Sequence, residues 1–141
     1  RNDMRELPIG KGECLSRGRD VAVLTIGPVA AEAAAAIEKA KGQGVSVAHY
    51  DMIFAKPLDE EIISEVAALG CPVITVEDGT VDGGMGSAVA DRLAEMGHTA
   101  TVHRMGIPDR FIPQGTPAQL RAMCGFDSES IYNKIVELVR R

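Results

Sequence analysis

The sequence has no basic run, no paired-cysteine motif and no long apolar stretch. Its net charge is −5, and no basic face is visible, which argues against a nucleic acid or an anionic membrane as a partner. The three cysteines, Cys14, Cys71 and Cys124, are widely spaced without a C-x-x-C pair, so reduced thiols in the cytoplasm are expected. Apolar runs stay well short of the ~20 residues that span a bilayer, and no signal peptide is predicted.

The length and the first residues predict one folded domain that follows a linker. At 141 residues the chain has the length of a single domain. It opens with RNDMRELPIGKGE, a charged, glycine-containing stretch without a methionine at position 1, and such stretches are typical of linkers. We therefore expect residues 1–13 to be a linker from a missing upstream domain and residues 14–141 to form the domain.

Apolar runs and helical patterns alternate along the chain. Residues 21–26 (VAVLTI), 45–50 and 72–76 are short and apolar, as in parallel strands that are covered on both faces. A weaker strand is expected at 101–103 and a short edge strand at 14–16. Helices are predicted between the strands and near the C-terminus, and such alternation gives a mostly parallel sheet between helices. The predicted fold is a three-layer α/β/α sandwich.

Capping residues mark the predicted helix ends. Pro28 suits the first turn of an alanine-rich helix, whose smooth face can lie close to a sheet. Asp59 is a good N-cap for the next helix, and Gly70 ends that helix. Thr116 and Gln119 predict a capping box at the start of a short helix.

A glycine-rich turn follows the third apolar strand, in VEDGTVDGGMGSAVADRLAEMG at 76–97. Strand, turn and helix follow each other as in phosphate-binding loops, but both known signatures fail. The dinucleotide pattern G-x-G-x-x-G has Val89 in place of its third glycine. The P-loop lysine is also absent, because no lysine occurs between Lys56 and Lys134.

Carboxylates near this turn oppose a bound anion as well. Glu77, Asp78 and Asp82 compete with a phosphate for the amide groups of the helix N-terminus. We therefore interpret the glycines as positions that permit special backbone shapes and close approach by a neighbouring domain or subunit. These glycines are Gly79, Gly83, Gly84 and Gly86.

The histidines form no recognisable catalytic group. His49, His98 and His103 have no serine or cysteine partner at a known spacing, so structural roles are favoured over a catalytic triad.

A long irregular turn at 106–115 allows two interpretations. It carries Asp109, Arg110 and Phe111, and such a loop can meet a ligand or a neighbouring domain. Alternatively, Phe111 and Ile112 pin the loop to the core. The residues alone do not form an active site.

Several motifs, in order, resemble those of one enzyme family. They are LPIGKGECLSRGRDVAVLTIG at 7–27, YDMIFAKPLDEEII at 50–63, VITVEDG at 73–79, GGMGSAV at 83–89 and GIPDRFIPQGTPAQLRAMCGFD at 106–127. Together they cover most of the chain, which resembles the C-terminal domain of the 1-deoxy-D-xylulose-5-phosphate synthases, thiamine-diphosphate enzymes related to transketolase. The last stretch separates these synthases from other transketolase relatives.

The resemblance implies a fold, a reaction and a cofactor. The fold is a five-stranded mixed sheet with one antiparallel edge strand. The full-length parent decarboxylates pyruvate and condenses it with glyceraldehyde 3-phosphate to give 1-deoxy-D-xylulose 5-phosphate, an isoprenoid precursor. In this family a G-D-G…N motif of an N-terminal domain holds thiamine diphosphate through Mg²⁺, and a glutamate of the middle domain activates the cofactor. This chain contains neither domain, so it is expected to be inactive alone and to bind no cofactor.

The family's C-terminal domain serves mainly as architecture and subunit contact, in a homodimer. The resemblance thus implies contacts with other domains of the same polypeptide and with a second subunit. One departure is Ile53, where the family usually has arginine, so no contact of that arginine is carried over. The candidate interface residues are Glu77, Asp78, Gly83, Gly84, Gly86, Ser87, Asp109 and Arg110.

Two other functions stay open at the level of sequence. One is an independent module that binds a small molecule or a nucleotide, although the defective fingerprint and the acidic turn argue against it. The other is the equivalent domain of another transketolase relative, such as the beta subunit of a 2-oxo acid dehydrogenase. A G-D-G…N motif in the upstream reading frame would select the synthase.

Overall fold

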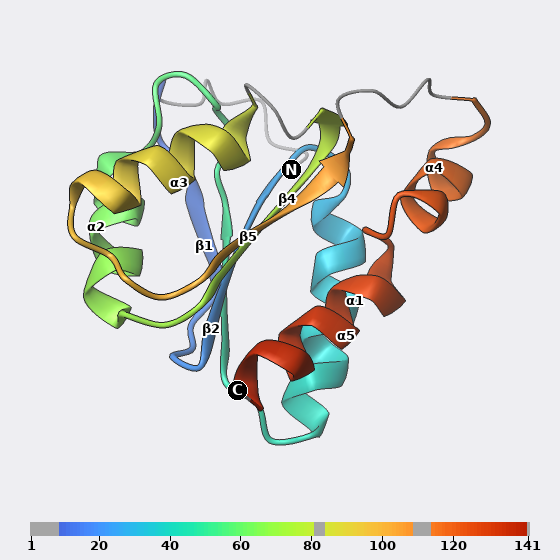
Figure 1. Cartoon of the computed structure of the whole chain (residues 1–141), viewed down its shortest axis with the longest axis horizontal. Helices are drawn as coiled ribbons and strands as arrows, with labels where there is room; N and C mark the ends of the chain where they lie inside the picture. Colours follow the sequence, from blue (N-terminus) through green and yellow to red (C-terminus); the bar gives the residue numbers. More distant parts are fainter. Residues whose placement is uncertain (1–8, 81–83, 109–113, 141) are drawn as a thin grey trace.

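Strands and helices alternate in the computed structural model, which describes residues 9–80, 84–108 and 114–140. From β2 to β5 each strand is followed by a helix, and α5 follows α4 (Figure 1). The described elements are β1 (Glu13–Ser16), β2 (Val21–Ile26), α1 (Ala30–Gly42), β3 (Val47–Asp51), α2 (Glu60–Leu69), β4 (Val73–Thr80), α3 (Met85–Glu95), β5 (Val102–Ile107), α4 (Pro117–Met123) and α5 (Ser128–Val139).

The five strands form one mixed sheet in the order β1-β3-β2-β4-β5. β2 pairs in parallel with both β3 and β4, and β4 pairs in parallel with β5. Of the described strands only β1, at one edge, is antiparallel, with Glu13 opposite Asp51 and Cys14 opposite Tyr50. The predicted α/β sandwich with an antiparallel edge strand near Cys14 is therefore confirmed.

Helices cover both faces of the sheet (Figure 1). α1 and α5 lie on one face, and α2 and α3 lie on the other. Neighbouring side chains of a strand point to opposite faces, so β2 sends Val21 and Val23 to the first layer and Ala22 and Leu24 to the second. Because both layers are apolar, the parallel strands are nearly continuous apolar runs in the sequence.

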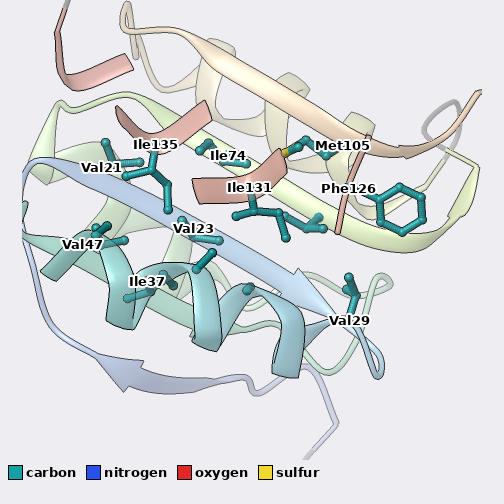
Figure 2. Close-up of a cluster of buried hydrophobic side chains, with 14 of the residues drawn as sticks. Val21, Val23, Val29, Ile37, Val47, Ile74, Met105, Phe126, Ile131 and Ile135 are labelled. Atoms are coloured by element: carbon teal, nitrogen blue, oxygen red, sulfur yellow. The ribbon is translucent and has the colours of Figure 1, made fainter. Parts of the chain in front are cut away.

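The layer that contains α1 and α5 is packed with small and branched side chains (Figure 2). α1 buries alanines against the sheet, as its predicted smooth face requires. α5 buries Ile131, Ile135 and Leu138. The buried alanines of α1 are Ala33, Ala36 and Ala40.

Within the described ranges no helix is both long and apolar enough to cross a membrane.

The predicted caps of α2 and α4 are present, whereas Pro28 lies one residue before the N-cap Val29 of α1 and not in the first turn of that helix. The side chain of Asp59 accepts two backbone N–H groups at the start of α2, and Gly70 ends that helix in the left-handed conformation. Thr116 and Gln119 form both hydrogen bonds of the capping box of α4. These ends are set by residues three or fewer positions away, which is why sequence alone locates them.

β4 is longer than the sequence predicts. β4 runs to Thr80 rather than ending near residue 76, and α3 begins at Met85. Carboxylates and glycines make the end of β4 resemble a loop in the sequence. In the structure Glu77 is buried and continues the strand beside Ile26 of β2.

β5 is also longer than its predicted three residues. It spans Val102–Ile107, and its last residues are buried. Arg104 is exposed and interrupts the apolar pattern, so the strand is weak in the sequence. Met105 and Ile107 nevertheless join the core cluster that contains Phe126.

Candidate functional site

The carboxyl ends of the parallel strands gather several residues that the sequence singles out. Gly27 and Pro28 follow β2, Glu77 and Asp78 lie near the end of β4, and α3 begins after the glycine-rich turn. The chain order of the strands reverses between β2 and β4. In sheets of this kind, ligands bind outside the carboxyl ends of the strands at such a reversal.

Glu77 occupies the N-terminus of α3. Its side chain is buried, and Oε1 accepts the N–H of Met85 at 3.1 Å while Oε2 accepts the N–H of Gly86 at 2.8 Å. A phosphate-binding loop offers such amide groups to a phosphate, and the positive end of the helix dipole favours negative charge there. The carboxylate of Glu77 stands in the place of an external anion, as the sequence predicts for a competitor of phosphate.

Gly86 is glycine for a reason inside the domain. It is buried in the first turn of α3. A Cβ built on it lies 2.5 Å from Oγ1 of Thr75, 3.1 Å from Oε2 of Glu77 and 3.2 Å from Cγ of Arg104. Contacts within the chain are therefore sufficient to explain this glycine, and a contact of Gly86 with another domain or subunit stays a prediction.

Three further residues of the turn have different surroundings. A Cβ built on Gly79 meets nothing within 4 Å. Gly84 is the N-cap of α3 in an extended conformation. The hydroxyl of Ser87 accepts a hydrogen bond from Nη1 of Arg104 at 2.9 Å. A role of Gly84 and Ser87 in an interface stays a prediction.

Asp78 joins three elements of this chain. Its Oδ2 accepts the N–H of Val29 at 2.9 Å, at the start of α1. Arg121 of α4 donates from Nε to Oδ1 at 2.8 Å and from Nη2 to Oδ2 at 3.1 Å. The hydrogen bond with Asp78 raises the pKa of Arg121. The carboxylate of Asp78 therefore connects β4 to α1 and α4 through hydrogen bonds within the domain.

Glu32 extends this network to α5. Its Oε1 lies 3.9 Å from Nη1 of Arg121, and its Oε2 accepts the N–H of Ser128 at 3.0 Å. None of the side chains of α4 is buried. Within the described structure, Arg121 is the main polar attachment of that helix to the rest of the domain. Sequence reasoning missed Arg121, since 42 residues separate it from Asp78 and no local pattern links them.

A groove of about 260 Å³ lies beside this network. Its polar lining groups, Asp78 and Arg121, bind each other. A nucleotide site needs polar groups that are available to the ligand, so the groove does not support the alternative of a nucleotide-binding module. The apolar lining residues are Pro28, Ile107, Pro117, Leu120 and Phe126.

His49 and His98 have structural surroundings. His49 is buried, with Nε2 2.9 Å from Oγ1 of Thr25. Burial and, to a smaller extent, the positive charge of Lys41 lower the pKa of His49 to about 4. Nε2 of His98 lies 3.1 Å from the carbonyl oxygen of Cys71, and burial raises the pKa of that thiol. A raised pKa is the opposite of what a reactive cysteine requires.

Some predicted site residues lie outside the described residues. They include Gly83, Asp109 and Arg110 of the candidate interface. Asp82 of the turn and Phe111 and Ile112 of the long loop are outside as well. Both interpretations of that loop therefore stay predictions.

The described residues do not fit thiamine diphosphate or its metal ion. Within the ranges 9–80, 84–108 and 114–140, no three His, Cys, Asp or Glu side chains converge as a metal site requires. The N-terminus of α3, where a diphosphate would find amide groups, is filled by Glu77. No chemistry of that cofactor is assigned to this chain.

The sequence is similar to known families and enzymes. Residues 10–131 match the family model of the transketolase C-terminal domain. A 1-deoxy-D-xylulose-5-phosphate synthase of Parabacteroides distasonis is 50% identical over 135 residues, which cover 96% of this chain and 21% of that protein. One from Bacteroides thetaiotaomicron is 46% identical over 135 residues, or 95% of this chain and 21% of that protein.

Solved structures share the fold. A split-gene transketolase, described as an inactive beta4 tetramer, matches with a TM-score of 0.85 and 29% identity over 96% of this chain and 44% of that one. A transketolase mutant from Pichia stipitis matches with a TM-score of 0.65 and 19% identity over 93% of this chain and 18% of that one. The second likeness concerns the fold alone.

Proposed function

The chain belongs to the transketolase C-terminal domain family, and from this premise we propose that it is the C-terminal domain of a 1-deoxy-D-xylulose-5-phosphate synthase. The observation that carries the proposal is the identity of 42–50% to synthases of that name over almost the whole chain. The chain spans about a fifth of the length of these relatives. The activity therefore belongs to a longer parent polypeptide.

The proposed parent is a cytoplasmic transferase that condenses pyruvate with glyceraldehyde 3-phosphate, with thiamine diphosphate and Mg²⁺ as cofactors. We propose that the chain contributes structure and assembly. Support comes from the network around Asp78 and from Glu77, whose carboxylate fills the helix end at which a phosphate would bind. The proposed partners are the other domains of the same polypeptide and a second subunit of a homodimer.

We retain residues 1–13 as the linker in this proposal and residues 14–141 as the domain. β1 begins at Glu13, and the family match begins at residue 10. The end of the linker is held against α2, because the N–H of Gly12 donates to Oδ2 of Asp59 at 2.8 Å.

An assay of the full-length polypeptide that contains this chain tests the proposal. The purified protein is incubated with pyruvate, glyceraldehyde 3-phosphate, Mg²⁺ and thiamine diphosphate, and both CO₂ release and the five-carbon product are measured. Product that depends on all four components is the expected result. If an oxidised lipoyl carrier is added, release of CO₂ with reductive acylation of its disulfide to an S-acyldihydrolipoyl group, and no sugar phosphate, would instead identify a 2-oxo acid dehydrogenase.

A further inference from the structure

The loop between β3 and α2 carries two large apolar side chains that belong to neither described core cluster. Ile53 and Phe54 are partly exposed. Among the described residues, neither belongs to a core cluster or packs against one, whereas Met52 and Leu58 of the same loop do. Apolar side chains grouped at a surface mark sites of contact with another surface.

The backbone of this loop is strained at the same place. Ile53 is the only described residue other than glycine with a positive φ, 63°. A β-branched side chain crowds the backbone in this left-handed region, so the conformation is costly. Oδ1 of Asp51 accepts the N–H of Ile53 at 3.1 Å and holds the turn. Strain of this kind persists where the surrounding structure imposes it and is concentrated at functional sites.

The beginning of the described chain is fixed against the same loop. A Cβ built on Gly10 would lie 3.0 Å from Cγ of Pro57, and Nζ of Lys11 lies 3.0 Å from Oε1 of Glu61. Ile9 comes just before these contacts, and 79% of its surface is exposed. Ile9, the first described residue, therefore lies near the loop that carries the two apolar side chains.

We infer that Ile9, Ile53 and Phe54 form a docking surface for the part of the same polypeptide that precedes this domain. The inference rests on the proposed function, in which the chain is about a fifth of a longer protein. A domain tethered beside the surface has a high effective concentration, so a small apolar patch is sufficient to hold it. The partner's surface is expected to be apolar.

This surface differs from the interface that the glycine-rich turn suggests. Glu77 and Gly86 are used within the domain, as their hydrogen bonds and close contacts show. Ile53 and Phe54 have no such use among the described residues. The loop after β3 is therefore the better supported place of contact.

Amide hydrogen exchange tests the inference by comparing the 141-residue chain with the full-length polypeptide. We expect peptides that cover residues 53–58 to exchange about tenfold more slowly in the full-length protein, because docking covers the loop. Peptides that cover α4 serve as the internal control and should change little. Equal exchange of 53–58 in both proteins, or protection confined to the glycine-rich turn, would overturn the inference.

Matched variants of the full-length protein identify the side chains responsible. Phe54→Ser should remove the protection of residues 53–58, whereas Met123→Ser, at a position 63% exposed on α4, should leave it. Ile53→Gly keeps the left-handed backbone available but removes the apolar side chain, and it should weaken the protection as well. Unchanged protection in both loop variants would overturn the inference.

Two further measurements distinguish docking within one polypeptide from self-association and from the enzymatic proposal. If the 141-residue chain alone gains the protection as its concentration rises, the occupant is a second copy and the inference fails. Synthase activity is measured on the same full-length protein. Protection of the loop without product would support the docking surface and contradict the proposed enzymatic function. Product without protection of the loop would support the enzymatic function and contradict the docking surface.

Discussion

At the scale of single residues, Glu77 and Gly86 act as a pair that joins β4 to α3. The buried carboxylate accepts two backbone N–H groups at the positive end of the helix, and hydrogen bonds to a charged acceptor are stronger than those between neutral groups. Gly86 leaves room for the carboxylate: a Cβ there would lie 3.1 Å from Oε2, so a side chain would push this oxygen by a few tenths of an ångström. The strand and the helix are therefore closely packed at this position.

Gly86→Ala should destabilise the isolated chain by about 1–3 kcal/mol, the range for overpacking a well-packed site. The new methyl group would lie 2.5 Å from Oγ1 of Thr75, which is fully buried and cannot move into solvent. The free energy of unfolding, measured with urea, checks this expectation. Gly79→Ala is the matched control, since a Cβ there meets nothing within 4 Å.

A double-mutant cycle shows whether the cost arises at this contact. Thr75→Ala removes the hydroxyl that crowds the new methyl group, so the double variant should lose at least about 0.5 kcal/mol less than the sum of the single losses. Strict additivity would mean that Gly86 is required for another reason.

His49 should make stability depend on pH. Its pKa is about 4 in the folded chain, against 6.5 for a histidine that is not buried. Between these values the unfolded chain binds the proton and the folded chain does not, so stability rises with pH. The contribution is complete above pH 6.5 and falls by about 3 kcal/mol as the pH drops toward 4, at 1.36 kcal/mol per pKa unit.

Replacement of His49 by glutamine isolates this contribution from that of the carboxylates, which titrate over part of the same range. The variant should lose less stability than the original chain between about pH 7 and about pH 4.5, as measured by urea unfolding at each pH. The difference between the two losses is the quantity of interest. Equal losses in the two chains would show that His49 is protonated without penalty in the folded state.

In this region the sequence predicts the role of the carboxylates better than the role of Gly86. Carboxylates before a helix are visible as competitors for its N-terminal amides, and Glu77 does bind them. The contact that fixes Gly86 involves Thr75 of the neighbouring strand. The distance between Gly86 and Thr75 depends on how α3 packs against the sheet, and no local sequence pattern encodes that packing.

At the scale of elements, α4 is held in an unusual way. It has seven residues and buries none of their side chains. Its start is stabilised by the capping box, and its last turn is attached through Arg121 to Asp78. Because packing contributes little, the caps and this ion pair decide whether the helix forms.

Thr116→Ala should therefore loosen α4 locally. Loss of the cap costs about 1 kcal/mol, which corresponds to about fivefold faster amide exchange in α4 at an unchanged rate in the core. The exposed Thr99, outside every described helix, provides the control variant Thr99→Ala. Unchanged exchange in α4 would show that the capping box adds no stability.

The two attachments of α4 also show what sequence reveals about elements. The capping box lies within four consecutive residues, so Thr116 and Gln119 predict the start of the helix correctly. The bond between Arg121 and Asp78 joins segments that are brought together only by the fold. The sequence underestimates the lengths of β4 and β5 for the same reason, since the buried Glu77 and the core position of Ile107 depend on distant partners.

At the scale of the whole molecule, the mostly parallel sheet and its two helix layers follow from the strand–helix alternation and the apolar runs, whereas the strand order is known only from the structure. The edge where such a sheet usually binds ligands is occupied by its own side chains. Glu77 fills the helix terminus, and Asp78 and Arg121 neutralise each other beside the groove. The domain thus keeps the architecture of a ligand-binding sheet while its polar groups serve internal contacts.

The isolated 141-residue chain should accordingly bind neither thiamine diphosphate nor Mg²⁺ tightly. Its sequence has no G-D-G motif, and the described residues hold no cluster of metal ligands. The amide groups of α3 that could receive a diphosphate already bind Glu77. Calorimetric titration with the cofactor and Mg²⁺ should therefore give only the heat of dilution.

Thermal unfolding gives a second test of the same expectation. A ligand present at about 100 times its Kd stabilises the folded state by about 2.7 kcal/mol, which raises the Tm of a domain of this size by several degrees. With about 1 mM cofactor, an unchanged Tm excludes a Kd near about 10 µM. One site per chain at micromolar affinity would contradict the assignment of cofactor binding to the other domains of the parent. It would also require Glu77 to leave the helix terminus, and Glu77→Gln would then strengthen binding because it removes the competing charge.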